Sequence, residues 1–120
     1  MSDRSRTILI VDDDPQILRL VEKMLQHRKV TVLMAPRPTE ALRVCEEKSI
    51  DVLISDMKMP EMDGVKLADR VLKIHPEASV LLISGHYHEA PAAARQIRFL
   101  HKPFFPSDLI RHLQEMLPEG

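Results

Sequence analysis

Five short apolar segments, separated by segments of helical periodicity, are the feature that most limits the folds open to this chain. Each is rich in β-branched residues and is typical of a strand buried on both faces of a parallel sheet. Between them, apolar residues recur at helical spacing, as in Ile17, Leu18 and Val21. This alternation predicts an α/β domain with helices on both faces of one parallel sheet. The expected strands are residues 7–12, 30–35, 50–55, 79–84 and 97–101.

Capping residues locate several of the expected helices. Asp14 followed by Pro15 is typical of an N-cap and a first helical position, and Asp63 is the expected cap of a helix over Gly64–Ile74. A further helix is expected over residues 37–48 and a short, weak one over residues 90–96. The clearest amphipathic pattern lies near the C-terminus, at Leu109, Ile110, Leu113, Met116 and Leu117.

Length, charge and cysteine content exclude several classes of protein. The 120 residues, of which 44% are hydrophobic and 29% charged, predict one globular domain over residues 1–120, with a core at about 7–117. A net charge of −1 provides no basic field for nucleic acid. We expect no membrane span and no signal peptide, because no apolar run is long enough and the N-terminus is polar. The single Cys45 fits a reducing compartment, so a cytoplasmic location is expected.

Polar and charged residues follow four of the expected strands directly. Ligands of open α/β sheets bind beyond the carboxyl ends of the strands, and these ends converge if the first strand lies between the second and third. Crowded carboxylates require a cation, and an oxygen-rich site suits Mg²⁺, which indicates phosphoryl-transfer chemistry. The residues concerned are Asp12, Asp13 and Asp14 after the first strand, Asp56 after the third, Ser84 after the fourth and Lys102 after the fifth.

Four motifs together resemble the receiver domain of two-component response regulators. They are "ILIVDDD", "DVLISDMKMPEMDG", "VLLISG" and "HKPF", and the resemblance extends from about Thr7 to Leu117. It implies a flavodoxin-like doubly wound (βα)₅ fold with a five-stranded parallel sheet in the order 2-1-3-4-5. It also implies a signalling domain rather than an enzyme, which accepts a phosphoryl group and switches conformation to signal output. The implied partner is a sensor histidine kinase or a histidine phosphotransfer protein. We also expect a capacity for homodimer formation, and no direct contact with nucleic acid or membrane.

The resemblance assigns a role to each matching residue of the site. Asp56 corresponds to the phosphoacceptor, and Lys102 to the cation that holds a phosphoryl oxygen. Ser84 and Phe99 correspond to the switch hydroxyl and the switch aromatic. The Lys102–Pro103 peptide bond is expected to be cis. The implied Mg²⁺ ligands are Asp12, Asp13, Asp56 and the backbone carbonyl of Lys58.

Two features depart from the family pattern. The stretch from Ser84 to Lys102 is about one helical turn, roughly 3.6 residues, shorter than the resemblance implies. We therefore expect a short or remodelled fourth helix. Phe105 stands where Ser, Asp or Asn normally caps the last helix, which should cost about 1 kcal/mol unless Ser107 compensates.

Other functions are compatible with parts of the pattern. A dehalogenase-type phosphatase uses an Asp-x-Asp at a strand end, although the further acidic motifs of such enzymes are missing here. A flavodoxin shares the fold, but the acidic "DDDP" loop repels a flavin phosphate. A pseudo-receiver would bind partners without phosphorylation. Transition metals also have candidate ligands in the loop methionines and in the pair His86 and His88. The methionines more readily fill gaps around the loop, and the two histidines more readily form a solvated rim of the site.

Overall fold

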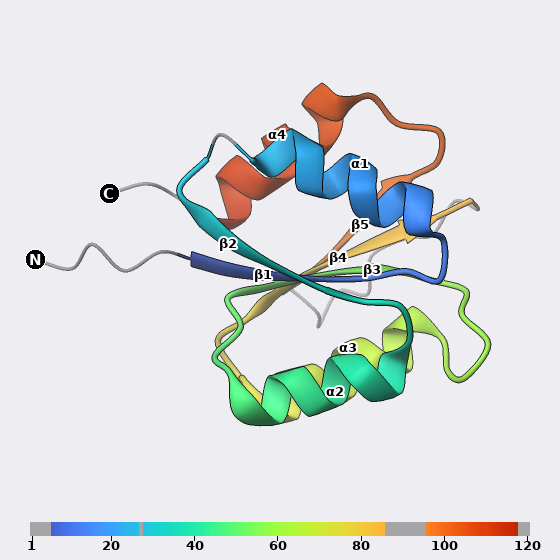
Figure 1. The fold of residues 1–120 in the computed structure, drawn as a ribbon, viewed down its shortest axis with the longest axis vertical. Coiled ribbons are helices and arrows are strands. Elements are labelled where there is room, and N and C mark those ends of the chain that lie inside the picture. Colours follow the sequence, from blue (N-terminus) through green and yellow to red (C-terminus); the bar gives the residue numbers. More distant parts are fainter. Residues whose placement is uncertain (1–5, 27, 86–95, 118–120) are drawn as a thin grey trace, which may run out of the picture.

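A single parallel sheet of five strands forms the centre of the computed structural model, which describes residues 6–26, 28–85 and 96–117 (Figure 1). The strand order is β2-β1-β3-β4-β5, as predicted. Every neighbouring pair is parallel, so the carboxyl ends of all five strands lie along one edge. The strands are β1 Arg6–Val11, β2 Val30–Ala35, β3 Val52–Asp56, β4 Ser79–Ser84 and β5 Ile97–His101.

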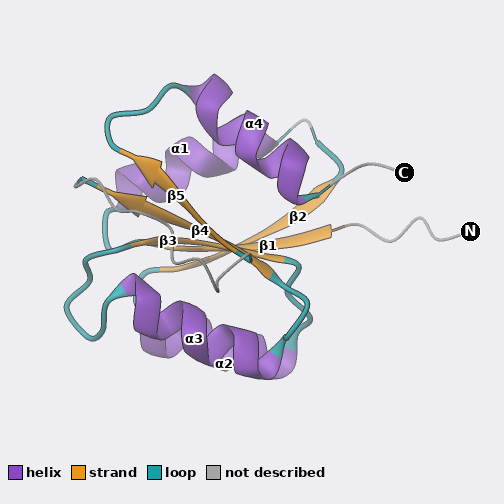
Figure 2. Cartoon of the chain, turned by 180° about the vertical axis from the view of Figure 1, so that it is seen from behind, coloured by secondary structure: helices purple, strands orange, loops and turns teal. Residues whose placement is uncertain are grey.

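Helices cover both faces of the sheet, with α1 and α4 on one face and α2 and α3 on the other (Figures 1 and 2). Side chains of β1 alternate between the two resulting cores. Ile8 and Ile10 belong to the core that includes α1 and α4 residues, whereas Leu9 and Val11 belong to the core that includes α2 and α3 residues. The helices are α1 Pro15–Leu25, α2 Pro38–Glu47, α3 Gly64–Ile74 and α4 Pro106–Met116.

Helix caps explain where three of these helices begin. Asp14 Oδ1 accepts from the Gln16 N–H at 2.9 Å, and Asp63 Oδ1 accepts from the Lys66 N–H at 2.8 Å, so both predicted caps are confirmed. At α4, the side chain of the N-cap residue Phe105 makes no capping hydrogen bond. Its backbone N–H instead donates to Asp108 Oδ2 at 2.9 Å, so the expected compensation comes from Asp108 rather than from Ser107.

The remaining differences from the sequence-based expectations are local. β1 begins one residue earlier than expected, and β3 is shifted toward its carboxyl end so that it includes Asp56. The Lys102–Pro103 bond is cis, as expected. The short helix expected over residues 90–96, and the remodelling expected there, fall almost entirely outside the described residues. Within residues 6–26, 28–85 and 96–117, no helix has the length and apolar character that a bilayer span requires.

Candidate functional site

Three carboxylates meet at the carboxyl edge of the sheet. β1 and β3 are neighbours, so Asp12 and Asp13, which follow β1, lie beside Asp56, the last residue of β3. One oxygen from each carboxylate lies within 4.8 Å of the others. The sequence-based prediction that these three residues converge is therefore confirmed.

Asp12 is the buried member of this cluster, with a relative exposure of 2%. Its Oδ1 accepts from the Asp14 N–H at 2.9 Å, whereas its Oδ2 is buried and has no hydrogen-bond partner among the described residues. The pKa of Asp12 is raised to about 6, chiefly by burial. The charges of Asp56 and Asp13 also act to raise this pKa, whereas the Asp14 N–H and Lys102 act to lower it. A buried oxygen without a partner in a cluster of three carboxylates fits a hard cation such as Mg²⁺.

The ammonium group of Lys102, the residue that follows β5, faces this cluster. Lys102 Nζ lies 3.8 Å from Asp56 Oδ1, and the Asp56 side chain is only 15% exposed. The backbone holds Lys102 in place, because its N–H donates to the Ser84 carbonyl at 2.7 Å. Asp56 Oδ1 also accepts a long bond from the Lys58 N–H at 3.4 Å. An ammonium group and an adjacent backbone N–H beside a carboxylate are suited to hold phosphoryl oxygens.

Residues 8–114 match the family described as the response regulator receiver domain. This chain belongs to that family. Family membership together with the acidic cluster identifies it as a phosphoacceptor domain of two-component signalling rather than a catalytic enzyme. The dehalogenase-type phosphatase and flavodoxin alternatives are therefore wrong.

Relatives of this receiver domain differ in length. The chain is 33% identical over 124 residues to the transcriptional regulatory protein GlrR of Escherichia coli (strain K12). That alignment covers the whole of this chain but only 28% of GlrR. The chain is 31% identical to the response regulator receiver protein CpdR of Brucella abortus (strain 2308), covering 93% of this chain and 97% of CpdR. The sensor kinase CckA of the same organism is 37% identical over 120 residues, which cover 94% of this chain and 13% of CckA.

Solved structures confirm the receiver fold. The response regulator TrrA of Thermotoga maritima, solved in complex with Mg²⁺-BeF, aligns with a TM-score of 0.82 at 25% identity, covering 93% of this chain and 99% of TrrA. The receiver domain of the hybrid histidine kinase CckA aligns with a TM-score of 0.80 at 32% identity, covering 92% of this chain and 98% of that domain.

The loop that leaves Asp56 is held close to the strand end. The Met57 N–H donates to the Ile83 carbonyl at 2.9 Å, and the Gly64 N–H donates to the Met57 carbonyl at 2.8 Å. A Cβ atom on Gly64 would lie 2.7 Å from the Asp56 carbonyl oxygen, so this contact requires glycine. Met59 and Met62 pack against the core that includes α2 and α3 residues, which accounts for these methionines without a transition metal.

The remaining predicted residues lie on β4 and β5. Ser84 ends β4, is 3% exposed and pairs in register with His101, one residue before Lys102. Phe99 pairs with Leu82 and packs, half-buried, against the core that includes α2 and α3 residues. The structure therefore brings Ser84 to the same edge as the acidic cluster and places Phe99 further back along the same pair of strands. His86 and His88 lie outside the described residues.

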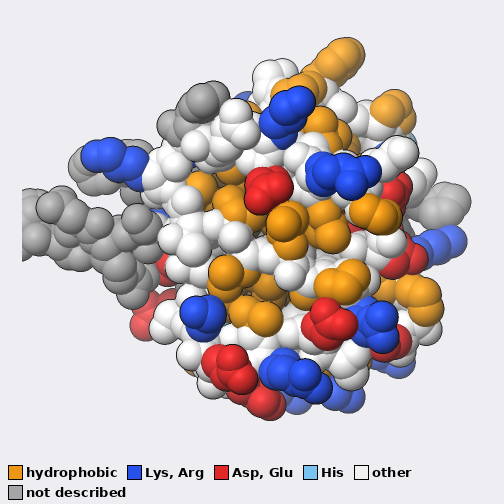
Figure 3. Space-filling view, in the orientation of Figure 1, with side chains coloured by type: hydrophobic (Ala, Val, Ile, Leu, Met, Phe, Trp, Pro, Cys, Tyr) orange, Lys and Arg blue, Asp and Glu red, His pale blue; other side chains and the backbone are white. Residues whose placement is uncertain are grey.

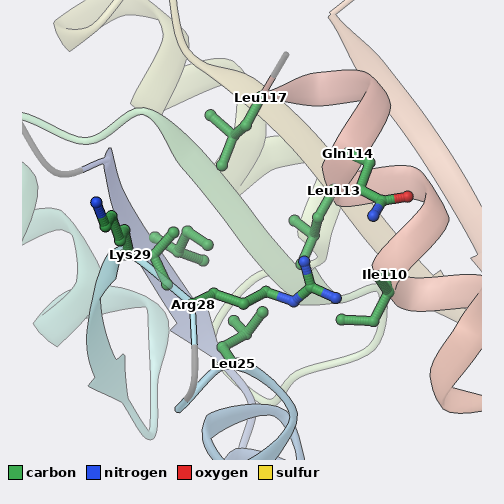
Figure 4. Close-up of a pocket in the computed structure, with 9 residues that line it drawn as sticks. Leu25, Arg28, Lys29, Ile110, Leu113, Gln114 and Leu117 are labelled. Atoms are coloured by element: carbon green, nitrogen blue, oxygen red, sulfur yellow. The ribbon is translucent and has the colours of Figure 1, made fainter. Parts of the chain in front are cut away.

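A hollow lies at the end of the sheet opposite the acidic cluster (Figure 4). It has a volume of about 310 Å³ and lies between the end of α1, the start of β2 and α4. Leu25, Ile110 and Leu113 give it an apolar lining, and Arg28 and Lys29 are its charged residues. None of its lining residues is acidic, so it lacks the oxygen ligands that distinguish the carboxyl edge.

Sequence reasoning missed one polar contact beside the site. Glu61 Oε1, in the loop after Asp56, accepts from the Thr39 hydroxyl at 2.7 Å and from the Thr39 N–H at 3.1 Å. These residues are 22 positions apart, so no local motif reports the contact. The sequence does contain one signal of it at the start of α2. Arg37 stands where a capping residue is normally found, and Pro38 lacks a backbone N–H, so this helix start has no cap of its own.

Proposed function

We propose that Asp56 is the phosphoacceptor of this receiver domain. The observation that carries the proposal is its position: a mostly buried carboxylate at the end of β3, paired with Lys102 and within ligand distance of Asp12 and Asp13. One Asp56 oxygen would attack the phosphorus of a phosphohistidine. The P–N bond breaks, an aspartyl phosphate forms and the imidazole leaves with its bonding electron pair.

The other residues of the site would support that transfer. The Lys102 ammonium would hold a phosphoryl oxygen, and the buried Ser84 hydroxyl would donate to another after transfer. Asp12, Asp13, Asp56 and the Lys58 carbonyl would hold Mg²⁺, which neutralises charge on the phosphoryl oxygens when bound. A change at Ser84 would reach Phe99 through β4 and β5, which are paired along this stretch. Ser84 and Phe99 would thus form the conformational switch.

A histidine kinase or a histidine phosphotransfer protein is the proposed phosphodonor. Its support is the family itself and the similarity to a segment of the sensor kinase CckA. We further propose a cytoplasmic location, a domain formed by residues 1–120, and a capacity for homodimer formation. On the face shown in Figure 3, charged side chains of both signs are mixed, and the described residues form no continuous basic stripe there. This mixture supports the proposal that the domain does not bind nucleic acid directly.

The decisive experiment is phosphorylation by a small phosphodonor. Incubation with acetyl phosphate and Mg²⁺ should add one phosphoryl group, measured by intact mass, and hydroxylamine should remove it as expected for an acyl phosphate. Asp56→Asn should remain folded and unmodified. Asp69→Asn, an exposed aspartate of α3 paired with Lys73, is the matched control and should be modified like wild type. Unchanged modification of Asp56→Asn would refute the assignment, and an unmodified wild type would indicate a pseudo-receiver.

A further inference from the structure

The middle of the loop after Asp56 is attached to the start of α2. Glu61 Oε1 accepts two hydrogen bonds from Thr39, at 2.7 Å from the hydroxyl and 3.1 Å from the backbone N–H. Both donors belong to one residue and converge on one oxygen atom. This geometry fixes the position of the Glu61 carboxylate relative to the helix more firmly than a single hydrogen bond would.

The start of α2 lacks a cap from its own sequence. Arg37, at the N-cap position, makes no side-chain capping bond, and Pro38 has no N–H. The Thr39 N–H is therefore the first backbone donor of α2, and Glu61 accepts from it as a capping side chain would. The Thr39 hydroxyl, the Thr39 N–H and the nearby Arg37 lower the pKa of Glu61, which keeps this carboxylate charged at the positive end of the helix.

The same helix start is also connected to the other side of the acidic cluster. Ala35 ends β2, and its carbonyl accepts from the Asp12 N–H at 3.3 Å. Arg37 and Pro38 follow within three residues. The connection between β2 and α2 thus contacts the backbone of Asp12 through Ala35 and the loop after Asp56 through Thr39.

The other contacts of the loop after Asp56 either fix only its two ends or are apolar contacts without a preferred orientation. At the ends of the loop, the Met57 N–H donates to Ile83 of β4, the Gly64 N–H donates to the Met57 carbonyl, and Asp63 caps α3. Met59 and Met62 contribute apolar packing, which fixes distance but not rotation. Among the described residues, the two hydrogen bonds that Thr39 donates to Glu61 are the directional polar contacts between the middle of the loop and α2.

We propose that Glu61 is a positioning residue of the Mg²⁺ site. By attaching residues 57–63 to the start of α2, it holds the Lys58 carbonyl in register with the Asp12 and Asp56 carboxylates. Glu61 itself contacts neither the ion nor the phosphoryl group. The inference rests on the proposed function in one respect, the assignment of the Lys58 carbonyl as a ligand.

Calorimetric Mg²⁺ titration of the full chain tests this role without a phosphodonor. Glu61→Ala should weaken Mg²⁺ binding about tenfold, the lower end of the range for residues that orient metal ligands. Glu61→Gln keeps the acceptor oxygen and removes the charge, so it should recover most of the lost affinity. Thr39→Val keeps the backbone donor and should fall between wild type and Glu61→Ala. Glu47→Ala, the same charge change at the far end of α2, should bind like wild type.

Two results would overturn the inference. One is a Glu61→Ala protein, folded by circular dichroism, with wild-type Mg²⁺ affinity. The other is an equal loss of affinity in Glu61→Ala, Glu61→Gln and Glu47→Ala, which would indicate long-range charge instead of positioning. The outcome is separable from the phosphoacceptor assignment: a wild-type protein that binds Mg²⁺ but is not phosphorylated would refute that assignment, while weaker Mg²⁺ binding by Glu61→Ala would still support positioning.

Discussion

Asp12 and Asp51 are aspartates at opposite edges of the same sheet, and their surroundings differ. Asp51, just before β3, has both carboxylate oxygens matched: Oδ2 accepts from the Thr7 N–H at 2.7 Å, and Oδ1 lies 4.0 Å from Arg6. Its backbone also joins strand starts, since its N–H donates to the Thr7 carbonyl and its carbonyl accepts from the Ser79 N–H. Asp12, just after β1, is more deeply buried and has an oxygen without a hydrogen-bond partner among the described residues.

The comparison separates an aspartate that stabilises the fold from one that weakens it. A satisfied carboxylate at a strand start stabilises the pairing of β1 with β3. A buried carboxylate with one oxygen lacking a hydrogen-bond partner destabilises the folded protein until a proton or a cation binds it. Residues that lower stability in this way are expected where a ligand binds, and the carboxyl edge of the sheet is where Asp56 and Lys102 also lie.

Neutralising Asp12 should have the largest effect on stability. Without Mg²⁺, the folded-state pKa of about 6 exceeds the ordinary value of 3.8. The folded protein therefore binds more protons between these values, and this contribution to stability is lost as pH rises through about 6. Asn cannot ionise, so the unfolding free energy of Asp12→Asn relative to wild type should rise by about 2.4 kcal/mol between pH 4 and pH 7. Urea unfolding in chelator at several pH values measures this, and a difference independent of pH would contradict it.

Replacing Asp51, whose carboxylate oxygens have partners, should lower stability, whereas Asp12→Asn should raise it near neutral pH. Asp51→Ala leaves the half-buried Thr7 N–H without its acceptor and should lower the unfolding free energy by about 1–3 kcal/mol. Its Mg²⁺ affinity should equal that of wild type, because Asp51 lies at the other edge of the sheet. Urea unfolding and Mg²⁺ titration of the same preparation test both statements. Weakened Mg²⁺ binding would show that the two edges are not independent.

Mg²⁺ binding should offset the loss of stability caused by the crowded carboxylates at the carboxyl edge of the sheet. At ten times its dissociation constant, Mg²⁺ should raise the unfolding free energy of wild type by about 1.4 kcal/mol through mass action. Asp13→Asn should lose most of that gain, whereas Asp51→Asn should retain it. Thermal melts with and without Mg²⁺ provide the measurement. An equal Mg²⁺ shift in wild type and Asp13→Asn would exclude Asp13 as a ligand.

The smallest expected effect concerns a helix start on the carboxyl side of the sheet. α1 is capped by Asp14, whereas the Phe105 side chain at the start of α4 makes no cap and is 75% exposed. Phe105→Ser should add a capping acceptor and raise the unfolding free energy by about 0.5–1 kcal/mol. Phe105→Ala is the control that removes the ring without adding an acceptor. Equal unfolding free energies for the two variants would show that Asp108 already satisfies this helix start.

The sequence predicted those parts of the molecule that depend on local patterns and on one rule of topology. Apolar segments located the strands, and Asp14 and Asp63 located two helix starts, because these signals act over a few residues. The convergence of Asp12 and Asp56 followed from the carboxyl edge of a parallel sheet. The contacts of Asp51 with Thr7 and of Glu61 with Thr39 were not predicted. They join residues 44 and 22 positions apart, and they depend on side-chain reach and strand register that no local pattern encodes.

The close approach of Gly64 to the carbonyl of Asp56 also determines which mutations this domain tolerates. Any replacement adds a Cβ atom that would lie 2.7 Å from a backbone oxygen and 3.1 Å from the Met57 Cα, and backbone atoms cannot rotate away as a side chain can. At Gly85, which follows β4, no atom of the described residues lies within 4 Å of the same hypothetical atom. If every substitution were made at both positions and the variants were selected for folding, we would therefore expect only glycine to survive at position 64. Many different residues should survive at position 85.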